Sequence, residues 1–374
     1  MTLNTNEVLA KVPTKLLIAG EWREASSGET FNVENPATGA TIATLDSANS
    51  ADALAALDAA CAVQDEWAQT TPRERANILR RAFELVHERA DEFATLMTLE
   101  MGKPFAESQG EVTYGAEYLR WFSEEATRDY GRYSPVPEGT LRMVTRRKPV
   151  GPCLLITPWN FPLAMATRKV APVVAAGCTM VMKPAEFTHY SALIYGILAE
   201  KAGIPAGVVN IVTGDAPAIG EEMCENPLLR KITFTGSTRV GKLLAGNAGK
   251  NMKKISMELG GNAPFIVFDD ADMDNAVYWA VEAIFRNSGQ ICLAGSRLYV
   301  QSGIYDEFME RFVAAFSADG YLTDIPTGAT LRGRAIGDYI GWLNTAFPDI
   351  HRELFKLYTA GDVVVVELAI RGTH

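Results

Sequence analysis

The middle of the chain alternates short apolar runs with amphipathic segments. Apolar runs predict strands at residues 153–157, 179–182, 208–212 and 231–235, and helices are expected to begin near Leu163, Thr188, Ala216 and Ser237. Because strands alternate with helices in this way, both faces of each strand are expected to be buried, as in a parallel sheet with helices on both sides. The pattern therefore predicts an α/β fold with a doubly wound parallel sheet, in which ligands bind beyond the carboxyl ends of the strands.

The N-terminal third predicts short strands followed by helices. Residues 15–42 mix short apolar runs with glycine and Asn-Pro turns, which predicts a layer of hairpins. An Ala-rich helix is expected from Ser50 to about Trp67. The sequence Thr71-Pro72-Arg73-Glu74 is typical of a helix start and predicts one long helix as far as Gly102, followed by another from Phe105 to about Arg128.

Two motifs that could carry chemistry bracket the next stretch. They are Met257-Glu258-Leu259-Gly260-Gly261-Asn262 and Gly289-Gln290-Ile291-Cys292. An apolar run at 264–268 predicts a buried strand, and a helix is expected over 272–288, so Glu258 and Cys292 are predicted on neighbouring elements of one α/β layer. A thiol with a carboxylate nearby suits acyl chemistry on an aldehyde or ester. The alternative is a buried, inert cysteine, which is the commoner situation for a single free cysteine.

Composition and charge narrow the class of protein. The formal net charge of −10 argues against nucleic acid as a partner, because phosphate contacts need clustered Lys and Arg. The sequence has no long apolar run that could span a membrane and no apolar segment near its start that is typical of a secretory signal. The five cysteines have no C-x-x-C pair or metal-ligand spacing, which favours a reducing cytoplasm and predicts no metal site.

Five short motifs resemble the aldehyde dehydrogenase superfamily and occur in that family's order. They are Pro158-Trp159-Asn160-Phe161-Pro162, Lys183-Pro184-Ala185-Glu186, Phe234-Thr235-Gly236-Ser237 with Gly241, and the two motifs that hold Glu258 and Cys292. Residues 97–104 and Thr167-Arg168-Lys169 are most similar to the succinate-semialdehyde dehydrogenase branch. The resemblance covers about residues 12–316.

The resemblance implies a role for each catalytic candidate. Cys292 would attack the aldehyde as a thiolate, and the side-chain amide of Asn160 with the backbone N–H of Cys292 would hold the resulting oxyanion. After hydride transfer to the nicotinamide, Glu258 would activate the water that hydrolyses the thioester. Lys169 would help to position Asn160 or Glu258, with a solvated surface lysine as an equal alternative.

The resemblance also implies a dinucleotide site. Residues 236–241 do not fit the G-x-G-x-x-G pattern, and by themselves they could form a plain strand-to-helix turn, but in the family this turn faces the cofactor diphosphate. A carboxylate at Glu186 would accept from a ribose 2′-hydroxyl and repel a 2′-phosphate, which favours NAD, with NADP as the alternative. The full set of implied cofactor residues is Thr157, Pro158, Trp159, Lys183, Pro184, Ala185, Glu186, Gly214, Phe234, Gly236, Ser237, Gly241 and Leu259.

Two arginines are implied as substrate ligands. Arg168 and Arg286 match the arginines that the branch directs at the distal carboxylate of succinate semialdehyde. The alternative is that each arginine pairs with a local glutamate. Branch members often have a second cysteine two residues after the nucleophile, and this chain has Ala294 there, so a disulfide switch between neighbouring thiols is not expected.

The resemblance changes after Phe316. Residues 319–374 resemble part of a SnoaL-like polyketide cyclase, through Asp324 to Gly328, Leu331 to Gly333, Ala346 to Asp349, Val363 to Glu367 and Gly372 to His374. We therefore expect an incomplete catalytic domain followed by a C-terminal α+β fragment. The predicted boundaries are 12–125 with 148–258 for the NAD-binding domain, 126–147 for an oligomerisation hairpin, 259–316 for a partial catalytic domain and 319–374 for the last segment.

These features leave several functions open. The leading hypothesis is oxidation of succinate semialdehyde to its acid, by a homo-oligomer as in the family. A related semialdehyde or a non-acidic aldehyde is the nearest alternative substrate. The alternatives to an active dehydrogenase are a pseudoenzyme that still binds nucleotide, a scaffold for partner subunits, a fused or frame-shifted product, and a small-molecule isomerase or cyclase built on the C-terminal segment.

Overall fold

The chain forms two compact units. The computed structural model describes residues 4–189, 196, 199–315, 321–324, 329–332, 335, 338, 351–360 and 363–371. The first unit comprises Met1–Asn35 and Gly39–Leu259, and the second comprises Gly260–His374 with Pro36–Thr38.

A seven-stranded sheet forms the centre of the first unit. Its strands lie in the order β11 (Lys254–Leu259), β10 (Lys231–Gly236), β7 (Cys153–Ile156), β8 (Met180–Lys183), β9 (Val209–Ile211), β1 (Leu16–Ile18) and β2 (Glu21–Arg23). The strands from β11 to β9 are parallel, as the four apolar runs predict. The sheet is nevertheless mixed, since β1 pairs antiparallel with β9 and β2 pairs antiparallel with β1.

The predicted parallel sheet gains an antiparallel edge from β1 and β2, which lie in the predicted hairpin layer, for a local reason. Ala19 and Gly20 connect β1 to β2 with φ values of 55° and 82°, and so tight a turn can join only antiparallel neighbours. Strand β11 was also not predicted. It is the opposite edge of the sheet and its side chains are mostly exposed, so it lacks the continuous apolar run that marks the inner strands.

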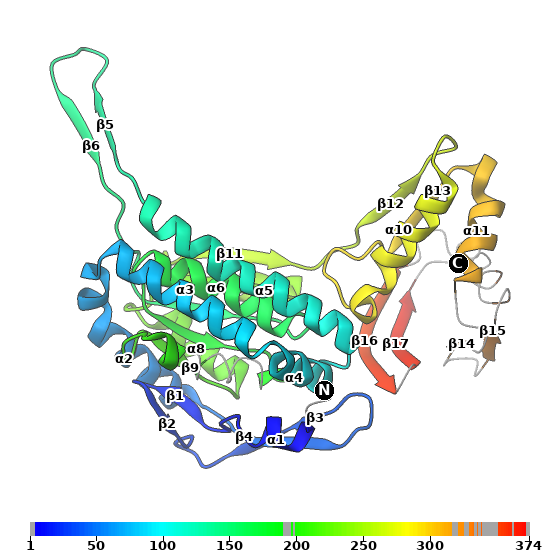
Figure 1. Ribbon diagram of the computed structural model, residues 1–374, viewed down its shortest axis with the longest axis horizontal. Helices are drawn as coiled ribbons and strands as arrows, with labels where there is room; N and C mark the ends of the chain where they lie inside the picture. Colours follow the sequence, from blue (N-terminus) through cyan, green and yellow to red (C-terminus); the bar gives the residue numbers. More distant parts are fainter. Residues whose placement is uncertain are drawn as a thin grey trace. The chain divides into compact units, whose positions relative to one another are not determined.

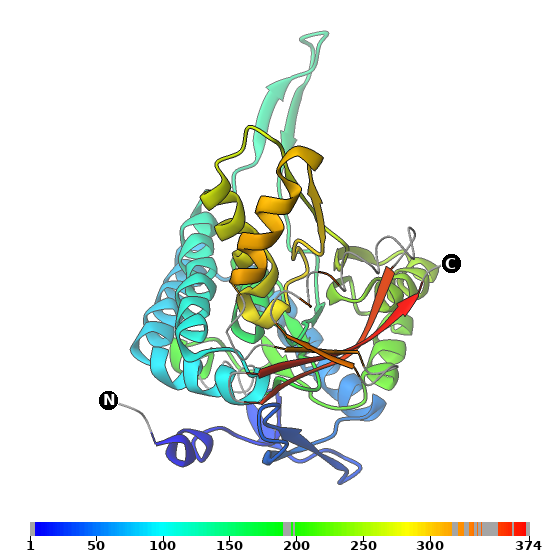
Figure 2. The ribbon, with the colours of Figure 1, turned by 90° about the vertical axis from the view of Figure 1, so that its right-hand side faces the viewer.

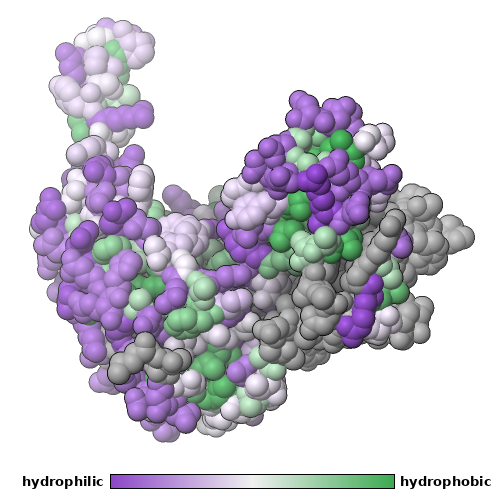
Figure 3. Space-filling model, turned by 45° about the vertical axis from the view of Figure 1, so that its right-hand side comes forward, coloured by the Kyte–Doolittle hydropathy of each residue, from purple (hydrophilic) through white to green (hydrophobic). Residues whose placement is uncertain are grey.

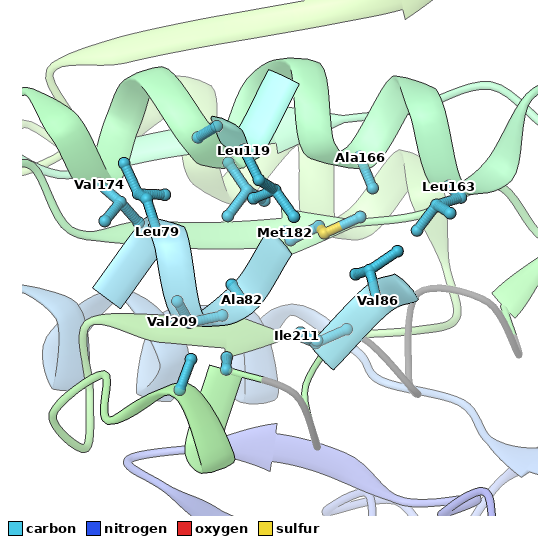
Figure 4. Packing of buried hydrophobic residues seen from close by; sticks show 14 of the residues in the cluster. Leu79, Ala82, Val86, Leu119, Leu163, Ala166, Val174, Met182, Val209 and Ile211 are labelled. Carbon is cyan, nitrogen blue, oxygen red and sulfur yellow. The ribbon is translucent and has the colours of Figure 1, made fainter. Parts of the chain in front are cut away.

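Helices cover both faces of this sheet (Figure 1). Helices α3 (Pro72–Glu88), α4 (Ala90–Met101), α5 (Phe105–Glu125) and α6 (Pro162–Ala175) share one hydrophobic core with Leu155, Met182 and Ile211 of the strands. Helices α2 (Ser50–Gln69), α8 (Ala216–Glu225) and α9 (Thr238–Lys250) pack around the alternate residues Leu154 and Val181. Figure 4 shows the first core, to which three helices contribute Leu79, Leu119 and Leu163 and two strands contribute Met182 and Val209.

Helix boundaries follow local capping chemistry. The Thr71 side chain accepts a hydrogen bond from the Glu74 N–H at 3.2 Å and starts α3 as predicted. The single long helix predicted from there to Gly102 is wrong, because Arg89 leaves the helical conformation (φ −116°, ψ 24°) and separates α3 from α4. Gly102, with a φ of 86°, ends α4 in the left-handed conformation that favours glycine.

The remaining elements of the first unit are small. They are α1 (Thr5–Leu9), the hairpin of β3 (Thr30–Glu34) and β4 (Thr41–Asp46), the short helix η1 (Ala126–Arg128), and the hairpin of β5 (Arg132–Pro135) and β6 (Arg142–Thr145). Figures 1 and 2 show the β5–β6 hairpin extending away from the helices of its unit. It lies within the segment 126–147, whose part in oligomerisation stays a prediction. The helix expected near Thr188 lies largely outside the described residues.

The second unit contains β12 (Pro264–Val267) parallel to β13 (Arg297–Val300), with α10 (Met273–Phe285), η2 (Arg286–Gly289), η3 (Ser302–Ile304) and α11 (Tyr305–Ala314). Its described core consists of Val267, Ala280, Phe308 and Phe312. Two antiparallel pairs follow, β14 (Tyr321–Asp324) with β15 (Ala329–Arg332) and β16 (His351–Ala360) with β17 (Val363–Arg371). The motif residues 325–328, 333, 346–349 and 372–374 lie outside the described residues.

The prediction that Glu258 and Cys292 lie in one α/β layer is wrong. Glu258 belongs to β11 in the seven-stranded sheet of the first unit, whereas Cys292 lies between η2 and β13 in the second unit. The chain leaves the sheet after Leu259, so β12 pairs with β13 in a separate sheet.

Both units expose large hydrophobic side chains. Figure 3 shows hydrophobic residues among hydrophilic ones on the face of the second unit that holds α10. Large exposed hydrophobic side chains of this unit are Ile266, Phe268, Tyr278, Trp279, Phe285, Leu293, Tyr299 and Tyr305. No helix in the described part of the chain is long and apolar enough to cross a membrane.

Candidate active site

The order of the parallel strands creates a switch point between β7 and β10. From β7 the chain adds β8 and then β9 on one side, and it later places β10 and β11 on the other side. Helix α6 follows β7 onto one face of the sheet and α9 follows β10 onto the other, so their connections diverge at the carboxyl ends of these strands. This is the position at which open α/β sheets bind ligands.

The predicted cofactor residues lie at or just beyond strand ends on this edge. Thr157, Pro158 and Trp159 follow β7; Lys183 ends β8 and precedes Pro184, Ala185 and Glu186; Gly214 follows β9; Phe234, Gly236 and Ser237 mark the end of β10; and Leu259 ends β11. Gly241 lies in the first turns of α9. The first unit alone therefore gathers all of these residues at one edge of its sheet.

Close packing alone explains why glycine occurs at two of these positions, Gly214 and Gly241. A Cβ atom at Gly214, whose φ is 135°, would lie 2.4 Å from the backbone nitrogen of Ala48. A Cβ atom at Gly241 would lie 2.5 Å from Cδ2 of Leu259, so glycine lets α9 approach β11 closely. Leu259 and Gly241 thus form one helix–strand contact.

The start of α9 is suited to an anion. The Ser237 side chain caps the helix by accepting from the Val240 N–H at 3.3 Å. Ser237, Thr238 and Arg239 are exposed, so a ligand can approach the first turn. Backbone N–H groups and the helix dipole favour negative charge at such a position. The residues present therefore fit the diphosphate of a dinucleotide.

Lys183 and Glu186 form an ion pair beyond β8. The Lys183 side chain is 4% exposed and the Glu186 side chain is 48% exposed. Burial lowers the pKa of Lys183, and the charges of Glu186 and Asp215 oppose that shift. Glu186 therefore neutralises a buried ammonium group while part of its carboxylate faces solvent.

A buried ion pair holds the loop of Asn160. Lys103 and Glu111 are paired with side chains 0% and 1% exposed, and Lys103 Nζ donates to the backbone carbonyl of Asn160 at 3.4 Å. Glu111 Oε1 accepts from the backbone N–H groups of Leu163 and Ala164, each at 2.9 Å, at the start of α6. One carboxylate and one ammonium thus fix both the loop after β7 and the helix that follows it.

This pair was not predicted from the sequence. The available signal was a lysine in the motif 97–104 and a glutamate between apolar positions of α5, which are ordinary features of an exposed helix face. Burial raises the pKa of Glu111, although Lys103 and the two N–H groups of α6 favour the charged form. Only the tertiary fold brings Lys103, Glu111 and the Asn160 loop together.

Lys169 is a buried residue, so the alternative of a solvated surface lysine is wrong. It is 5% exposed, and its Nζ donates to Thr233 Oγ1 of β10 at 3.0 Å. Burial lowers the pKa of Lys169 to about 8, and the charge of Glu258 partly opposes this shift. Glu258 is exposed near the end of β11, opposite Thr235 in the β10–β11 register. Lys169 thus acts electrostatically on the predicted general base.

Arg168 contacts two tyrosines of α5. Its Nε and Nη2 donate to Tyr118 Oη at 3.0 Å and 2.7 Å, and its Nη2 also donates to Tyr114 Oη. The two tyrosine hydroxyls lie 2.7 Å apart. The alternative that Arg168 pairs with a local glutamate is therefore wrong, because its hydrogen-bond partners among the described residues are phenols. The tyrosines were not predicted, although their spacing of four residues on one helix places them on one face.

Cys292 and Arg286 lie in the second unit on either side of an unusual turn. Asn287, Ser288 and Gly289 have φ values of 56°, 56° and 74°. Left-handed conformations at non-glycine residues cost free energy and concentrate at functional sites. Arg286 and Cys292 are both exposed.

The other thiols are less accessible than Cys292. Cys153, Cys178 and Cys224 are buried and Cys61 is half-buried. Burial raises the pKa of Cys61 and of Cys224. Cys178 is the exception, because a hydrogen bond from the Cys153 thiol lowers its pKa to about 6, yet Cys178 is only 2% exposed. Within the described residues, no group of three or more His, Cys, Asp or Glu side chains is placed to hold a metal.

Residues 22–321 match the aldehyde dehydrogenase family. The chain is 54% identical over 327 residues to a succinate-semialdehyde dehydrogenase of Paenarthrobacter nicotinovorans, covering 87% of this chain and 71% of that protein. It is 47% identical to the NADP⁺-dependent succinate-semialdehyde dehydrogenase GabD of Escherichia coli K12, covering 90% and 70%. A glutarate-semialdehyde dehydrogenase of Pseudomonas aeruginosa is 47% identical, with 85% and 67% covered.

Solved structures agree with these relatives. An aldehyde dehydrogenase of Brucella melitensis biovar abortus 2308 superposes with a TM-score of 0.80 at 51% identity, covering 81% of this chain and 63% of that one. A betaine aldehyde dehydrogenase of Staphylococcus aureus in complex with NAD⁺ superposes with a TM-score of 0.81 at 33% identity, covering 83% and 62%. The chain thus spans less than two thirds of the length of these two structures. None of these matches supports the expected SnoaL-like segment at 319–374.

Proposed function

Since the chain belongs to the aldehyde dehydrogenase family, and is by homology classed with its NAD(P)-dependent members, we propose that it oxidises a carboxylate-bearing semialdehyde to the diacid with NAD. The observation that carries the proposal is the edge of the first unit at the β7–β10 switch point. There the Asn160 loop, the exposed start of α9 and the Lys183–Glu186 pair follow neighbouring strands.

The first unit supplies the proposed dinucleotide site. The first turn of α9 would hold the diphosphate, and Glu186 would accept from the ribose hydroxyls. When bound, the nicotinamide accepts the hydride of the aldehyde carbon. Among the relatives, the Escherichia coli enzyme carries NADP⁺ in its name and the Staphylococcus aureus structure contains NAD⁺. Glu186 favours NAD here, because its carboxylate would repel a 2′-phosphate.

The chain's own residues divide the chemistry between them. Cys292 is the proposed nucleophile, and its exposure on the turn after η2 leaves the thiol accessible. The Asn160 amide is the proposed oxyanion donor, on a loop fixed through its own carbonyl by Lys103. Glu258 is the proposed base for water, and Lys169 is close enough for the Glu258 charge to act on its pKa.

The proposed substrate carries a second carboxylate. Arg168 presents a guanidinium on α6, and Arg286 is the second proposed ligand, on η2. Two relatives at the same 47% identity are named for succinate semialdehyde and for glutarate semialdehyde, which differ by one methylene. We propose succinate semialdehyde, since the P. nicotinovorans relative at 54% identity is named for it.

The test is to follow NADH formation by the purified full chain with succinate semialdehyde, glutarate semialdehyde and butanal. The expected order of kcat/KM is succinate semialdehyde, then glutarate semialdehyde, then butanal. Butanal tests the carboxylate because it has the same carbon count as succinate semialdehyde without the acid. Equal rates for butanal and succinate semialdehyde would contradict the proposed substrate class.

A second candidate function is dinucleotide binding without turnover. It is favoured by the division of the chain, because every proposed cofactor residue is in the first unit and Cys292 is in the second. A rise in melting temperature with NAD, together with no NADH formation from any of the three aldehydes, would support this candidate over the dehydrogenase.

A further inference from the structure

Arg168, Tyr114 and Tyr118 form one cluster between α5 and α6. The guanidinium carbon of Arg168 lies 5.1 Å from the centre of the Tyr118 ring and 5.9 Å from that of Tyr114. The two rings meet edge to face, with centres 5.4 Å apart. Contacts with rings and hydroxyls thus hold the guanidinium in one orientation without a carboxylate partner in the described part of the chain.

Counting hydrogens shows which donors remain in this cluster. Tyr118 Oη accepts from Nε and Nη2 of Arg168, which fills its acceptor positions, so its own hydrogen points to Tyr114 Oη at 2.7 Å. Tyr114 Oη then accepts from Tyr118 and from Arg168 Nη2. The hydroxyl hydrogen of Tyr114 and both hydrogens of Arg168 Nη1 have no acceptor among the described residues.

We propose that Tyr114 binds the distal carboxylate of the substrate beside Arg168, and that Tyr118 is a positioning residue that orients the guanidinium. The inference rests on the proposed function, since it adds partners to the carboxylate assigned to Arg168. An anion with two acceptor oxygens can take the Tyr114 hydroxyl hydrogen with one oxygen and an Arg168 Nη1 hydrogen with the other. An uncharged aldehyde has no group to fill both donors.

Two further observations fit a donor role for Tyr114. Tyr114 is 43% exposed, so a ligand can reach its hydroxyl, and Tyr118 is half-buried beneath the guanidinium. Burial raises the pKa of Tyr114 in spite of the nearby Arg168 charge, so the phenol keeps its hydrogen at neutral pH.

The test compares the full chain with its Tyr114→Phe, Tyr118→Phe and Arg168→Ala variants. Succinate binding is measured by calorimetry, and KM is measured for succinate semialdehyde and for butanal. Tyr114→Phe should weaken succinate binding about tenfold and raise KM for succinate semialdehyde similarly, with butanal changed by less than about twofold. Tyr118→Phe should produce a smaller loss of the same selectivity. Tyr133→Phe, at an exposed tyrosine of β5, is the matched control and should change neither succinate binding nor KM for either aldehyde.

The outcomes separate this inference from the proposed function. If Arg168→Ala abolishes succinate binding but Tyr114→Phe leaves it unchanged, Tyr114 is not a ligand and the inference falls alone. If Tyr114→Phe weakens succinate semialdehyde and butanal equally, the residue acts only on stability, which also overturns the inference. If the unsubstituted chain shows no carboxylate selectivity, or if Arg168→Ala keeps that selectivity in full, the proposed role of Arg168 in carboxylate recognition fails as well.

Discussion

The two units differ in the groups that they bury. The first unit buries charged side chains within its core, as in the Lys103–Glu111 pair and Lys169, and satisfies each with a named partner. The second unit has four buried hydrophobic residues among its described positions and exposes large apolar side chains such as Trp279 and Leu293. A core that can enclose charges must be well packed, because unpaired buried charges are costly. The proposed cofactor site therefore rests on the more firmly packed unit, and Cys292 on the less firmly packed one.

Hydrogen exchange should show the largest difference between the units. Amides of β7, β8 and β10 are expected to exchange only on global unfolding, whereas amides of β12 and β13 should exchange through local opening. The expected gap in opening free energy is several kcal/mol, since openings range from about zero to the full stability of a domain. This gap is measured by letting the intact chain exchange and then following individual peptides by mass spectrometry. Equal protection of β8 and β13 would show that the second unit is packed as firmly as the first.

Thiol labelling sharpens the same comparison at single residues. Limiting iodoacetamide at neutral pH should modify Cys292 before the other four cysteines, because a buried thiol reacts only after its surroundings open. Cys178 provides the critical control, since its pKa is lowered to about 6 but it is 2% exposed. Faster labelling of Cys178 than of Cys292 would mean that thiolate content outweighs accessibility. It would also show that the first unit opens readily.

Replacing one partner of the buried Lys103–Glu111 pair should destabilise the first unit. Lys103→Met leaves Glu111 buried without its partner and should reduce the free energy of unfolding by about 3–5 kcal/mol. The double variant Lys103→Met with Glu111→Gln removes both charges and should recover a large part of that loss. Chemical denaturation measures both. The exposed pair Arg80–Glu84 is the matched control, and Arg80→Met should cost less than about 1 kcal/mol.

Sequence reasoning succeeded where burial was uniform and failed where the partner came from a distant part of the chain. The inner strands β7, β8, β9 and β10 were predictable because most of their side chains are buried, which leaves short and largely apolar runs between helices. Strand β11 has exposed residues at an edge, so no such run marks it, and Glu258 was consequently placed in the wrong layer. The break at Arg89 was hidden by a continuous helical pattern from α3 into α4.

The candidate site shows the same limit. The motifs located the cofactor edge, because the carboxyl ends of parallel strands must share one side of a sheet. The Lys103–Glu111 anchor of Asn160 could not be read from the sequence, since the lysine and the loop are 57 residues apart. The tyrosines next to Arg168 are 50 and 54 residues from it, and only the packing of α5 against α6 unites them.

Lys169 gives the first unit a pH dependence that can be measured. Its pKa is lowered from 10.5 to about 8, so the unfolded chain binds more protons than the folded chain between these values. Its contribution to stability is therefore lowest below pH 8 and increases as the pH rises toward 10.5. A shift of about 2.5 units corresponds to at most about 3 kcal/mol. The difference in unfolding free energy between the unsubstituted chain and Lys169→Met should follow this trend, and a difference that is constant with pH would contradict it.

The smallest expected effect concerns the choice between NAD and NADP in the first unit. Glu186→Ser should shift the ratio of dissociation constants about tenfold toward NADP, or roughly 1.4 kcal/mol. Two causes act together: the carboxylate that repels a 2′-phosphate is lost, and the ammonium of Lys183, which Glu186 neutralises, becomes available to it. Loss of the ion pair also lowers stability, but that cost is common to both cofactors and cancels in the ratio. Glu221→Ser, at an exposed glutamate of α8, is the control. An unchanged ratio in Glu186→Ser would mean that Glu186 serves only to neutralise Lys183, and the preference for NAD would then need another source.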